Sequence, residues 1–360
     1  MVRWALLYGS LAEYFAPVVS ILLPFRNASS TLDAAIRSIH AQSFRDWELL
    51  LIDNASADTS SSIAHDWSRR DPRIKLIEEP RIGIAHALNT GIAQATAPLI
   101  ARMDADDIAH PERLARQVAY MKEHPEIGVI STRTRFETTV EKSSGMAWFV
   151  NWQNAILSPH EHYVKRFVDA PLAHPTVMFR KELVVLSKHA PSSVEGSKGG
   201  CYSTDPLPED HELWLGWMHN GVRFAKLPEE LLTWHDHPQR LSRTHANYSV
   251  DAFFTTKAKW IAAWYTRKYL DARPIIIAGT SGLCRDRAAK LESQGLRIHA
   301  FTDVKRREVP GYAFIPHDEL PPAGEALVIS FISQRGTGDR IAAYLISRGL
   351  VEGDDFILAA

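Results

Sequence analysis

From residue 18 onwards, short apolar runs alternate regularly with longer amphipathic segments. The apolar runs predict buried strands, and the segments between them, with apolar residues at helical spacing, predict helices. Strands are expected at 18–25, 47–54, 73–79, 97–105 and 127–132, and helices at 31–43, 59–71, 83–95 and 111–124. Because continuous apolar strands that alternate with helices form parallel sheets covered on both faces, this part of the chain predicts an α/β fold.

The middle of the chain is less regular. Residues 141–183 mix aromatic residues and histidines, with a strand expected at 175–180, and residues 187–206 are rich in Gly, Ser and Pro, which predicts a loop. An acidic opening then leads into a helical pattern at 207–221. The amphipathic segment 248–271 carries aromatic and basic residues; it suits either a membrane surface or, as we favour, packing against the preceding domain.

The alternation of strands and helices restarts at Pro274, which predicts a second, smaller Rossmann-like α/β unit. A chain of 360 residues, of which 45% are hydrophobic and 23% charged, has the composition of a globular protein and is long enough for two domains. We therefore expect a larger domain over residues 1–272 and a small one over residues 273–360.

The overall charge excludes a bulk electrostatic footprint for nucleic acid, because 41 Lys and Arg residues are balanced by 42 Asp and Glu residues. The two cysteines, Cys201 and Cys284, form no CxxC pair or disulfide framework, which fits a reducing compartment. The first 20 residues, interrupted by Glu13, are too short an apolar stretch to span a bilayer and are interpreted as a lead-in helix. We expect a cytoplasmic protein with at most peripheral membrane contact.

Three polar turns follow predicted strand ends: Pro24 to Asn27, Asp53 to Ser56, and Asp104 to Asp107. In parallel α/β sheets, ligands bind beyond the carboxyl ends of the strands, so one crevice should collect these turns. Three carboxylates within four positions repel one another unless a cation or hydrogen-bond donors stabilise them. Oxygen ligands of this kind suit Mg²⁺ or Mn²⁺, and a nucleotide diphosphate would complete the coordination of the ion.

Six pieces of the sequence together resemble a bacterial family 2 glycosyltransferase of the GT-A fold. They are "SILLPFRNA", "FRDWELLLIDNASADTS", "ARMDADDIAHPERLARQ", "LAHPTVMFR", "PEDHELWLGW" and "WHDHPQRLSR", and they span roughly residues 18 to 265 in the family's order. The resemblance implies a doubly wound mixed sheet. It also implies inverting transfer of a hexosyl or N-acetylhexosaminyl group from a nucleotide-diphosphate sugar, with UDP expected, to an acceptor hydroxyl in bacterial glycan synthesis.

On the donor side, the resemblance implies that Pro24 and Asp53, together with Arg26 in the first turn, bind the nucleotide. The family's DxD motif matches Asp104 and Asp106. Asp106 is the expected metal ligand, and Asp104 is expected to bind the ribose or the metal. Asp107, the extra carboxylate beside this motif, is expected only to hydrogen-bond the turn.

On the acceptor side, the family's ED pair matches Glu209 and Asp210, with the Asp as the base. The transition state of a single displacement at the anomeric carbon is oxocarbenium-like, so a base must accept the proton of the acceptor hydroxyl. His237 matches a position that reaches the metal in some relatives. Arg240 and Arg243 are candidate partners for the departing diphosphate.

Each assignment has a simpler competitor. Asp53 could form only an Asx turn, Asp210 could only start a helix, and His237 could be a surface or core residue. His174 fits a structural or acceptor-side residue better than a metal ligand. Trp214 and Trp217, at helical spacing, are expected to be core residues.

The sequence departs from the family's pattern at two places. Relatives often carry DDGS where this chain has "DNAS", so Asn54 and Ala55 keep the first Asp but lose backbone freedom, with a mild expected effect. An Arg is common after "ELWL", where this chain has Gly216. A missing cation near the ED pair would alter the acceptor preference or weaken activity.

The C-terminal unit also departs from a known pattern, the dinucleotide fingerprint. A strand, a glycine turn, a helix and a second strand that ends in Asp303 have the right spacing, but Ser281 and Cys284 stand where the second and third fingerprint glycines would be. We therefore favour a structural, regulatory or partner-docking module over an NAD site.

Three other functions compete with metal-dependent sugar transfer to a glycan, lipid-linked or protein acceptor. A catalytically silent scaffold that binds nucleotide or glycan has only Gly216 in its support. A nucleotidyltransferase would need a glycine-rich basic loop after the first strand, and "FRNASST" contains no glycine. An oxidoreductase centred on the second domain is the least favoured.

Overall fold

The computed structural model describes residues 16–141, 143–186, 201–269, 273–334 and 336–360. The backbone packs into two compact units. The first consists of Met1–Leu157, Leu172–Thr204 and Val222–Arg240, and the second of Ser158–Pro171, Asp205–Gly221 and Leu241–Ala360. Residues 1–15 of the predicted lead-in helix and residues 187–200 of the predicted loop lie outside the described part. Residues 270–272 also lie outside it, and the domain boundary predicted after residue 272 stays a prediction.

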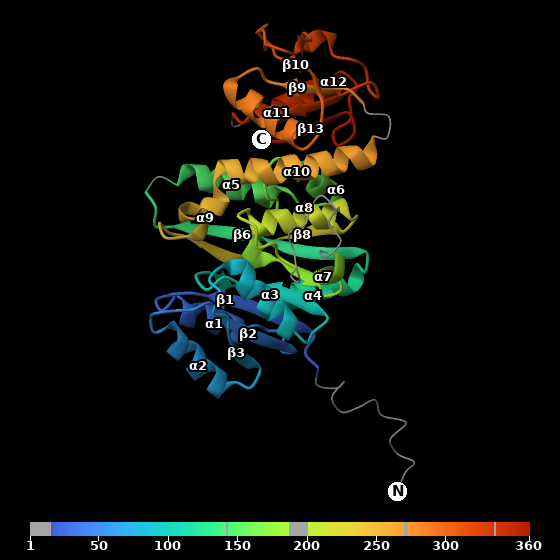
Figure 1. Ribbon diagram of the computed structural model, residues 1–360. Helices are drawn as coiled ribbons and strands as arrows, with labels where there is room; N and C mark the ends of the chain where they lie inside the picture. The colour runs from blue at the N-terminus through green and yellow to red at the C-terminus, as the bar shows by residue number, and fades with distance from the viewer. Residues whose placement is uncertain (1–15, 142, 187–200, 270–272, 335) are drawn as a thin grey trace. The chain divides into compact units, whose positions relative to one another are not determined.

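The first half of the large sheet consists of parallel strands joined by helices, as the alternation predicts. In chain order its elements are β1 (Val19–Phe25), α1 (Leu32–His40), β2 (Trp47–Asp53), α2 (Ser60–Arg70), β3 (Ile74–Glu78), α3 (Ile84–Gln94) and β4 (Leu99–Arg102) (Figure 1). Every residue of β1 and β2 is buried. Helices cover both faces of the sheet, because Leu22 and Leu23 of β1 point to opposite faces. Leu23 packs in one cluster with Ile36 of α1, and Leu22 lies against α3, where a Cβ on Gly91 would come within 3.0 Å of it.

The second half makes the sheet mixed. The strand order is β3-β2-β1-β4-β7-β6-β8-β5; β7 runs antiparallel to both β4 and β6, and β5 runs antiparallel to β8. Its elements are β5 (Ile108–Ala109), α4 (Arg113–Glu123), β6 (Ile127–Thr138), α5 (Ser144–Ala155), the 3₁₀ turn η1 (His174–Thr176), β7 (Met178–Arg180), α7 (Leu183–Leu186) and β8 (Arg223–Asp236). A mixed sheet of this kind confirms the fold that the family resemblance implies.

The long strand β8 is the main element that the sequence pattern does not reveal. Pro228 interrupts the apolar run, and a proline has no N–H to donate to a sheet. In the structure the register between β6 and β8 shifts between Thr132, opposite Leu227, and Arg133, opposite Glu230. Pro228 therefore lies in an irregularity of the ladder, and the strand continues on both sides of it.

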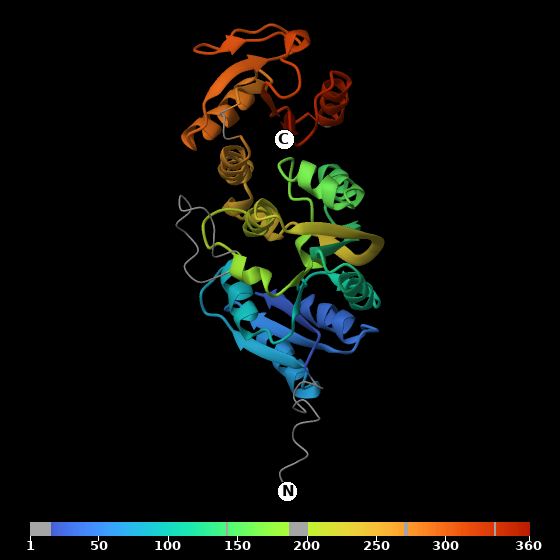
Figure 2. The ribbon, with the colours of Figure 1, turned by 90° about the vertical axis from the view of Figure 1, so that its right-hand side faces the viewer.

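The second unit contains a five-stranded, all-parallel sheet with the order β11-β10-β9-β12-β13. Its strands are β9 (Ile275–Ala278), β10 (Ile298–Thr302), β11 (Ala313–Phe314), β12 (Leu327–Ser330) and β13 (Phe356–Leu358). Its helical elements are α6 (Pro159–Lys165), α8 (Glu209–His219), α9 (Leu241–Thr244), η2 (Ala246–Tyr248), α10 (Val250–Lys268), α11 (Gly282–Ser293), η3 (His317–Glu319) and α12 (Thr337–Ser347). Helices α11 and α12 pack against opposite faces of the sheet (Figure 2). The predicted small Rossmann-like unit is confirmed.

The turn after β9 is filled by side chains of the same unit. Gly279 has a φ of 107°, and a Cβ there would lie 2.6 Å from Sγ of Cys284 and 2.9 Å from Cγ1 of Ile332. Thr280 donates its N–H and its hydroxyl to Asp303. Because a dinucleotide pyrophosphate must approach this backbone closely, these contacts disfavour an NAD site.

Ala55 adopts a backbone conformation that favours glycine. Its φ is 58°, in the left-handed region, at the position where relatives often carry the Gly of DDGS. A non-glycine residue in this conformation costs roughly 1–2 kcal/mol of folding free energy, which a glycine would not lose. Part of that advantage is cancelled, because glycine gives the unfolded chain more conformational entropy. We expect Ala55→Gly to raise the free energy of unfolding by about 0.5–1 kcal/mol in urea denaturation.

The matched control is Ala119→Gly on the exposed side of α4. There glycine should lower stability by about 1 kcal/mol, because the position is helical. Equal destabilisation by both substitutions would contradict the strain at Ala55.

Within the described ranges, none of the helices combines the length and the apolar character needed to cross a bilayer.

Candidate active site

The loops after β1 and β2 are tied together by side chains. Asn27, with a φ of 51°, accepts the N–H of Ala57 at 2.8 Å, and Ser60 accepts the N–H of Ala28 at 2.8 Å. Since β1 and β2 are parallel neighbours, with Pro24 opposite Ile52, both loops lie at the carboxyl edge of the sheet. Two turns joined by hydrogen bonds therefore lie at the sheet edge where the crevice is expected.

The predicted nucleotide residues of these turns differ in their surroundings. Pro24 is buried within β1, and Arg26 is exposed in the loop after it. Asp53 is buried, and its carboxylate accepts the N–H of Ser56 at 2.9 Å and the hydroxyl of Ser61. The carboxylate thus binds its own turn, through the N–H three residues on and not the N–H two residues on that defines an Asx turn. The nucleotide role of Asp53 stays a prediction.

Asn54 binds a third loop to the same edge. Its amide donates to the carbonyl oxygens of Glu79 at 3.1 Å and Arg81 at 2.7 Å, and its oxygen accepts the N–H of Gly83 at 2.8 Å. A carboxylate could not donate to two carbonyls, so an Asp would be repelled here. The amide of Asn54 therefore makes hydrogen bonds in this protein that an Asp, often present at this position in relatives, could not make.

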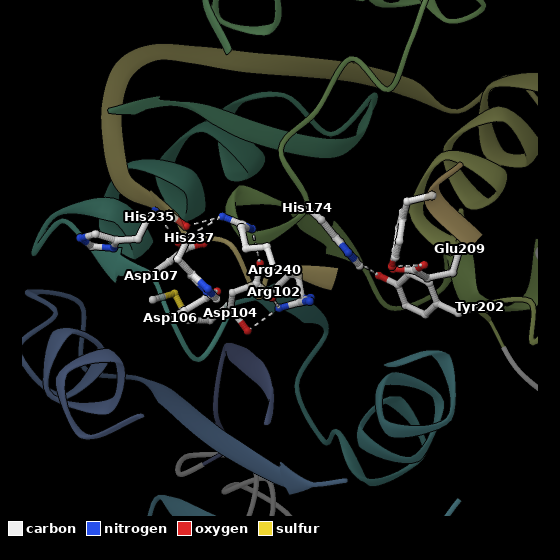
Figure 3. A network of polar contacts seen from close by, with 12 residues as sticks. Arg102, Asp104, Asp106, Asp107, His174, Tyr202, Glu209, His235, His237 and Arg240 are labelled. Atoms are coloured by element: carbon white, nitrogen blue, oxygen red, sulfur yellow. Dashed lines mark hydrogen bonds and ion pairs between the residues drawn. The ribbon is translucent and has the colours of Figure 1, made fainter. Parts of the chain in front are cut away.

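The three aspartates after β4 form one cluster. Oxygens of Asp104, Asp106 and Asp107 lie within 4.8 Å of one another (Figure 3). Asp106 is partly exposed, and its Oδ2 lies 2.9 Å from Nε2 of His237. The structure therefore brings His237, which lies just beyond the end of β8, to the aspartate cluster, and its role as a metal ligand stays a prediction.

Asp107 is the most buried member of the cluster. Its Oδ1 accepts the N–H of His235 in β8 at 2.9 Å, so the expected bond to its own turn is replaced by one to a distant strand. Its fully buried Oδ2 has no hydrogen-bond partner among the described residues. Burial raises the pKa of Asp107 well above its usual range; the guanidinium of Arg240 opposes this shift, and the charges of Asp106 and Asp104 add to it. A buried oxygen without a partner is costly, and a cation at the cluster would satisfy it.

Two arginines partly balance the carboxylates. Arg102, buried at the end of β4, places its NH1 2.6 Å from Oδ1 of Asp104. Arg240 lies 3.5 Å from Oδ2 of Asp104 and 3.9 Å from Oδ1 of Asp107. Arg113 is also fully buried nearby and donates to the carbonyl oxygen of Arg102; burial lowers its pKa to about 9.

Our sequence reasoning missed Arg102. The signal was present, because an arginine that interrupts an apolar strand directly before three carboxylates is a natural counter-charge. Arg240 was expected beside a phosphate, whereas here its guanidinium lies beside the aspartates.

His174 and Tyr202 form a buried pair in the first unit. Nε2 of His174 lies 2.9 Å from the Tyr202 hydroxyl, and burial lowers the pKa of His174 well below its usual range. The side chain of Asn89 in α3 accepts the N–H of Tyr202 at 2.9 Å and donates to its carbonyl at 2.8 Å. These contacts hold Tyr202 against His174 and α3, which fits a structural role, one of the two roles expected for His174.

The ED pair opens helix α8 in the second unit. Glu209 is buried and accepts the hydroxyl of Tyr248 at 2.7 Å. Asp210 is partly exposed, and its Oδ1 accepts the N–H of His211 at 2.7 Å. Arg243, another predicted nucleotide residue, is exposed in α9 of this unit. The roles of these residues stay predictions.

The sequence profile of glycosyl transferase family 2 matches residues 20–185. A protein named as a glycosyltransferase, EpsE of Bacillus subtilis (strain 168), is 30% identical over 241 residues, which cover 65% of this chain and 79% of EpsE. The chain belongs to glycosyl transferase family 2. The amylovoran biosynthesis glycosyltransferase AmsE of Erwinia amylovora is 29% identical over 216 residues, covering 59% of this chain and 74% of AmsE.

A solved structure supports the fold of this family 2 glycosyltransferase. Residues 1–349 of S. aureus TarS, in complex with UDP-GlcNAc, superpose with a TM-score of 0.51 at 14% sequence identity, over 77% of this chain and 71% of that one. At this identity the likeness concerns the fold alone.

The unusual glycine of helix α8 in this family 2 member has a packing explanation. A Cβ on Gly216 would lie 3.1 Å from Cζ2 and 3.2 Å from Cη2 of Trp260. Trp260 donates its Nε1–H to Glu212 at 2.8 Å, and Lys259 forms an ion pair with the same carboxylate. The space beside Gly216 thus holds a tryptophan, and a lysine of α10 supplies a cation to α8.

We expect Gly216→Arg to lower the free energy of unfolding by about 1–3 kcal/mol, because the new side chain overpacks against Trp260. Urea denaturation measures the effect, with Thr266→Arg on the exposed side of α10 as the control that also adds an arginine to this unit. Wild-type stability of Gly216→Arg would show that Trp260 does not explain the glycine.

Proposed function

We propose that this chain transfers a sugar, with inversion, from a nucleotide-diphosphate sugar to an acceptor hydroxyl, assisted by Mn²⁺ or Mg²⁺. The observation that carries the proposal is the aspartate cluster beyond the end of β4, with His237 beside it. Family 2 membership supplies the reaction class.

The residues present fit a hard divalent cation. Asp104, Asp106 and Asp107 offer carboxylate oxygens, which Mg²⁺ and Mn²⁺ prefer. A cation held by the first two would also offset the charge of the buried Asp107, whose Oδ2 has no hydrogen-bond partner among the described residues. We propose Asp106, Asp104 and His237 as the residues that hold the ion. When bound, such an ion supplies positive charge that stabilises the leaving diphosphate.

Asp210 is the proposed base. Its carboxylate would accept the proton of the acceptor hydroxyl as that oxygen attacks the anomeric carbon, and the bond from the sugar to the diphosphate breaks. The buried Glu209 precedes it, held by the Tyr248 hydroxyl, and would keep the start of α8 in position. We propose that the nucleotide diphosphate is bound by a set of residues that the resemblance names: Pro24, Arg26, Asp53, Asp104, Arg240 and Arg243.

The donor and acceptor classes rest on relatives. A UDP-sugar is proposed from the family resemblance, and TarS, which shares the fold, was solved with UDP-GlcNAc. AmsE is named for amylovoran biosynthesis, which supports a glycan acceptor in bacterial polysaccharide synthesis. The silent-scaffold alternative relied on Gly216, and the packing of Trp260 accounts for that residue. No specific observation then favours a second function.

The reaction class is tested by the phosphate product. The protein is incubated with UDP-, GDP- and dTDP-sugars and a bacterial glycolipid fraction as acceptor, with Mn²⁺ or with EDTA. We expect one donor to release nucleoside diphosphate only when Mn²⁺ is present. Release of pyrophosphate, or no diphosphate from any donor, would contradict sugar transfer.

A further inference from the structure

Arg240 lies between two carboxylates of the aspartate cluster. Its NH2 is 3.5 Å from Oδ2 of Asp104, and its NH1 is 3.9 Å from Oδ1 of Asp107 (Figure 3). Charge-assisted hydrogen bonds of this type are normally about 2.7–2.9 Å long. Both contacts are therefore ion pairs without close hydrogen bonds. They are easier to exchange for another anion than hydrogen-bonded ion pairs are.

The same guanidinium is held more closely by strand β8. NH1 donates to the carbonyl oxygen of His235 at 2.7 Å, and the guanidinium carbon lies 4.4 Å from the ring centroid of Trp234. These two contacts do not involve the carboxylates. Arg240 can therefore leave Asp104 and Asp107 while its side chain stays anchored on β8.

The charge balance of the cluster favours such an exchange. Asp104 has a second and shorter ion pair with Arg102, at 2.6 Å, and the buried Oδ2 of Asp107 has no partner among the described residues. A divalent ion at the carboxylates carries twice the charge of a guanidinium and binds at about 2.0–2.6 Å, so its attraction exceeds that of ion pairs at 3.5 and 3.9 Å.

We propose that Arg240 is an internal counter-cation of Asp104 and Asp107, and that it exchanges these carboxylates for the donor's diphosphate when a divalent ion binds the cluster. The inference rests on the proposed function. Arg240 competes with the metal when no nucleotide is present, and it binds the nucleotide once the metal has released it. Metal and nucleotide therefore bind cooperatively through one side chain.

The proposal predicts opposite effects of one substitution on two binding equilibria. In Arg240→Gln the competitor is lost, so Mn²⁺ alone should bind about three- to tenfold more tightly. The phosphate partner is lost as well, so UDP with saturating Mn²⁺ should bind about tenfold or more weakly. A merely structural role would weaken both or neither.

The experiment is isothermal titration calorimetry with MnCl₂ alone, and then with UDP at saturating Mn²⁺. Wild type, Arg240→Gln and Arg240→Lys are compared. Arg37→Gln is the control for loss of one positive charge, because Arg37 is exposed on α1 and paired with Asp33. Arg240→Lys keeps the charge, so its affinity for Mn²⁺ alone should stay near wild type. The thermal midpoint of each variant checks that it is folded.

Tighter Mn²⁺ binding and weaker UDP binding in Arg240→Gln, with both unchanged in Arg37→Gln, support the exchange. Mn²⁺ binding by folded Arg240→Gln that equals or falls below wild type overturns it, even when wild type binds Mn²⁺ and UDP normally. A wild-type protein that binds neither Mn²⁺ nor UDP would instead refute the proposed function itself.

Discussion

Asp106→Asn is expected to lower the rate of sugar transfer by at least about 10³-fold, because stabilisation of the leaving diphosphate by a bound divalent ion contributes several kcal/mol. The amide keeps the shape of the side chain but removes the charge that faces the metal. Asp106 is the partly exposed member of the cluster, and its Oδ2 already contacts His237. Turnover with saturating donor and Mn²⁺ gives the rate, and calorimetry with MnCl₂ gives the affinity.

The loss should not come from unfolding. Removing one of three crowded carboxylates relieves repulsion, so the metal-free variant should unfold at or above the wild-type temperature despite the weaker contact with His237. Asp46→Asn, at an exposed position before β2, is the matched control and should keep wild-type turnover. Wild-type turnover of Asp106→Asn would refute the proposed metal site.

Asp210→Asn is expected to lower kcat by about 10²–10⁴-fold, the usual contribution of a general base, because an amide cannot accept the proton of the acceptor hydroxyl. The affinity for UDP in the presence of Mn²⁺ should stay at the wild-type level, since Asp210 is not proposed to contact the nucleotide. Steady-state kinetics and calorimetry separate the two effects.

Asp251→Asn is the control for Asp210→Asn, because Asp251 is an exposed carboxylate in the first turn of α10 in the same unit. It should retain both turnover and UDP binding. A variant Asp210→Asn with wild-type kcat would remove Asp210 from the mechanism, and a joint loss of UDP binding would indicate a structural role instead.

Much of the fold follows from local pattern. Strands β1, β2 and β4 are mostly apolar and buried, and the polar turns after them meet because parallel neighbours end at one edge of the sheet. The crowding of Asp104, Asp106 and Asp107 also appears in the sequence itself, since like charges so close together require a counter-charge.

Other features depend on contacts between distant residues, which a local pattern cannot show. Strand β8 is hidden by Pro228, which the structure places at a register shift opposite β6. From the sequence, Gly216 suggests the loss of an arginine. The structure shows that Trp260, 44 positions later, packs against this glycine. The approach of Arg240 to Asp104 likewise joins two segments that no periodicity connects.

The turn after β9 disfavours a dinucleotide-binding role for the C-terminal sheet. Cys284 and Ile332 pack so closely against Gly279 that no Cβ fits there, and the N–H of Thr280 is already donated to Asp303. This agrees with our preference, from the sequence, for a structural, regulatory or docking module, which stays a prediction.

The most direct test of the central claim is a thermal-shift panel with UDP, GDP, dTDP and CMP, each with and without Mn²⁺, on wild type and Asp106→Asn. A ligand that binds the native state raises the unfolding temperature by mass action, and no acceptor is needed. We predict that one nucleoside diphosphate, UDP, stabilises the wild-type protein only with Mn²⁺ and does not stabilise Asp106→Asn. Two results would contradict a metal-dependent nucleotide-sugar site at the aspartate cluster. One is that no nucleotide at millimolar concentration shifts the unfolding temperature, and the other is that wild type and Asp106→Asn show equal shifts.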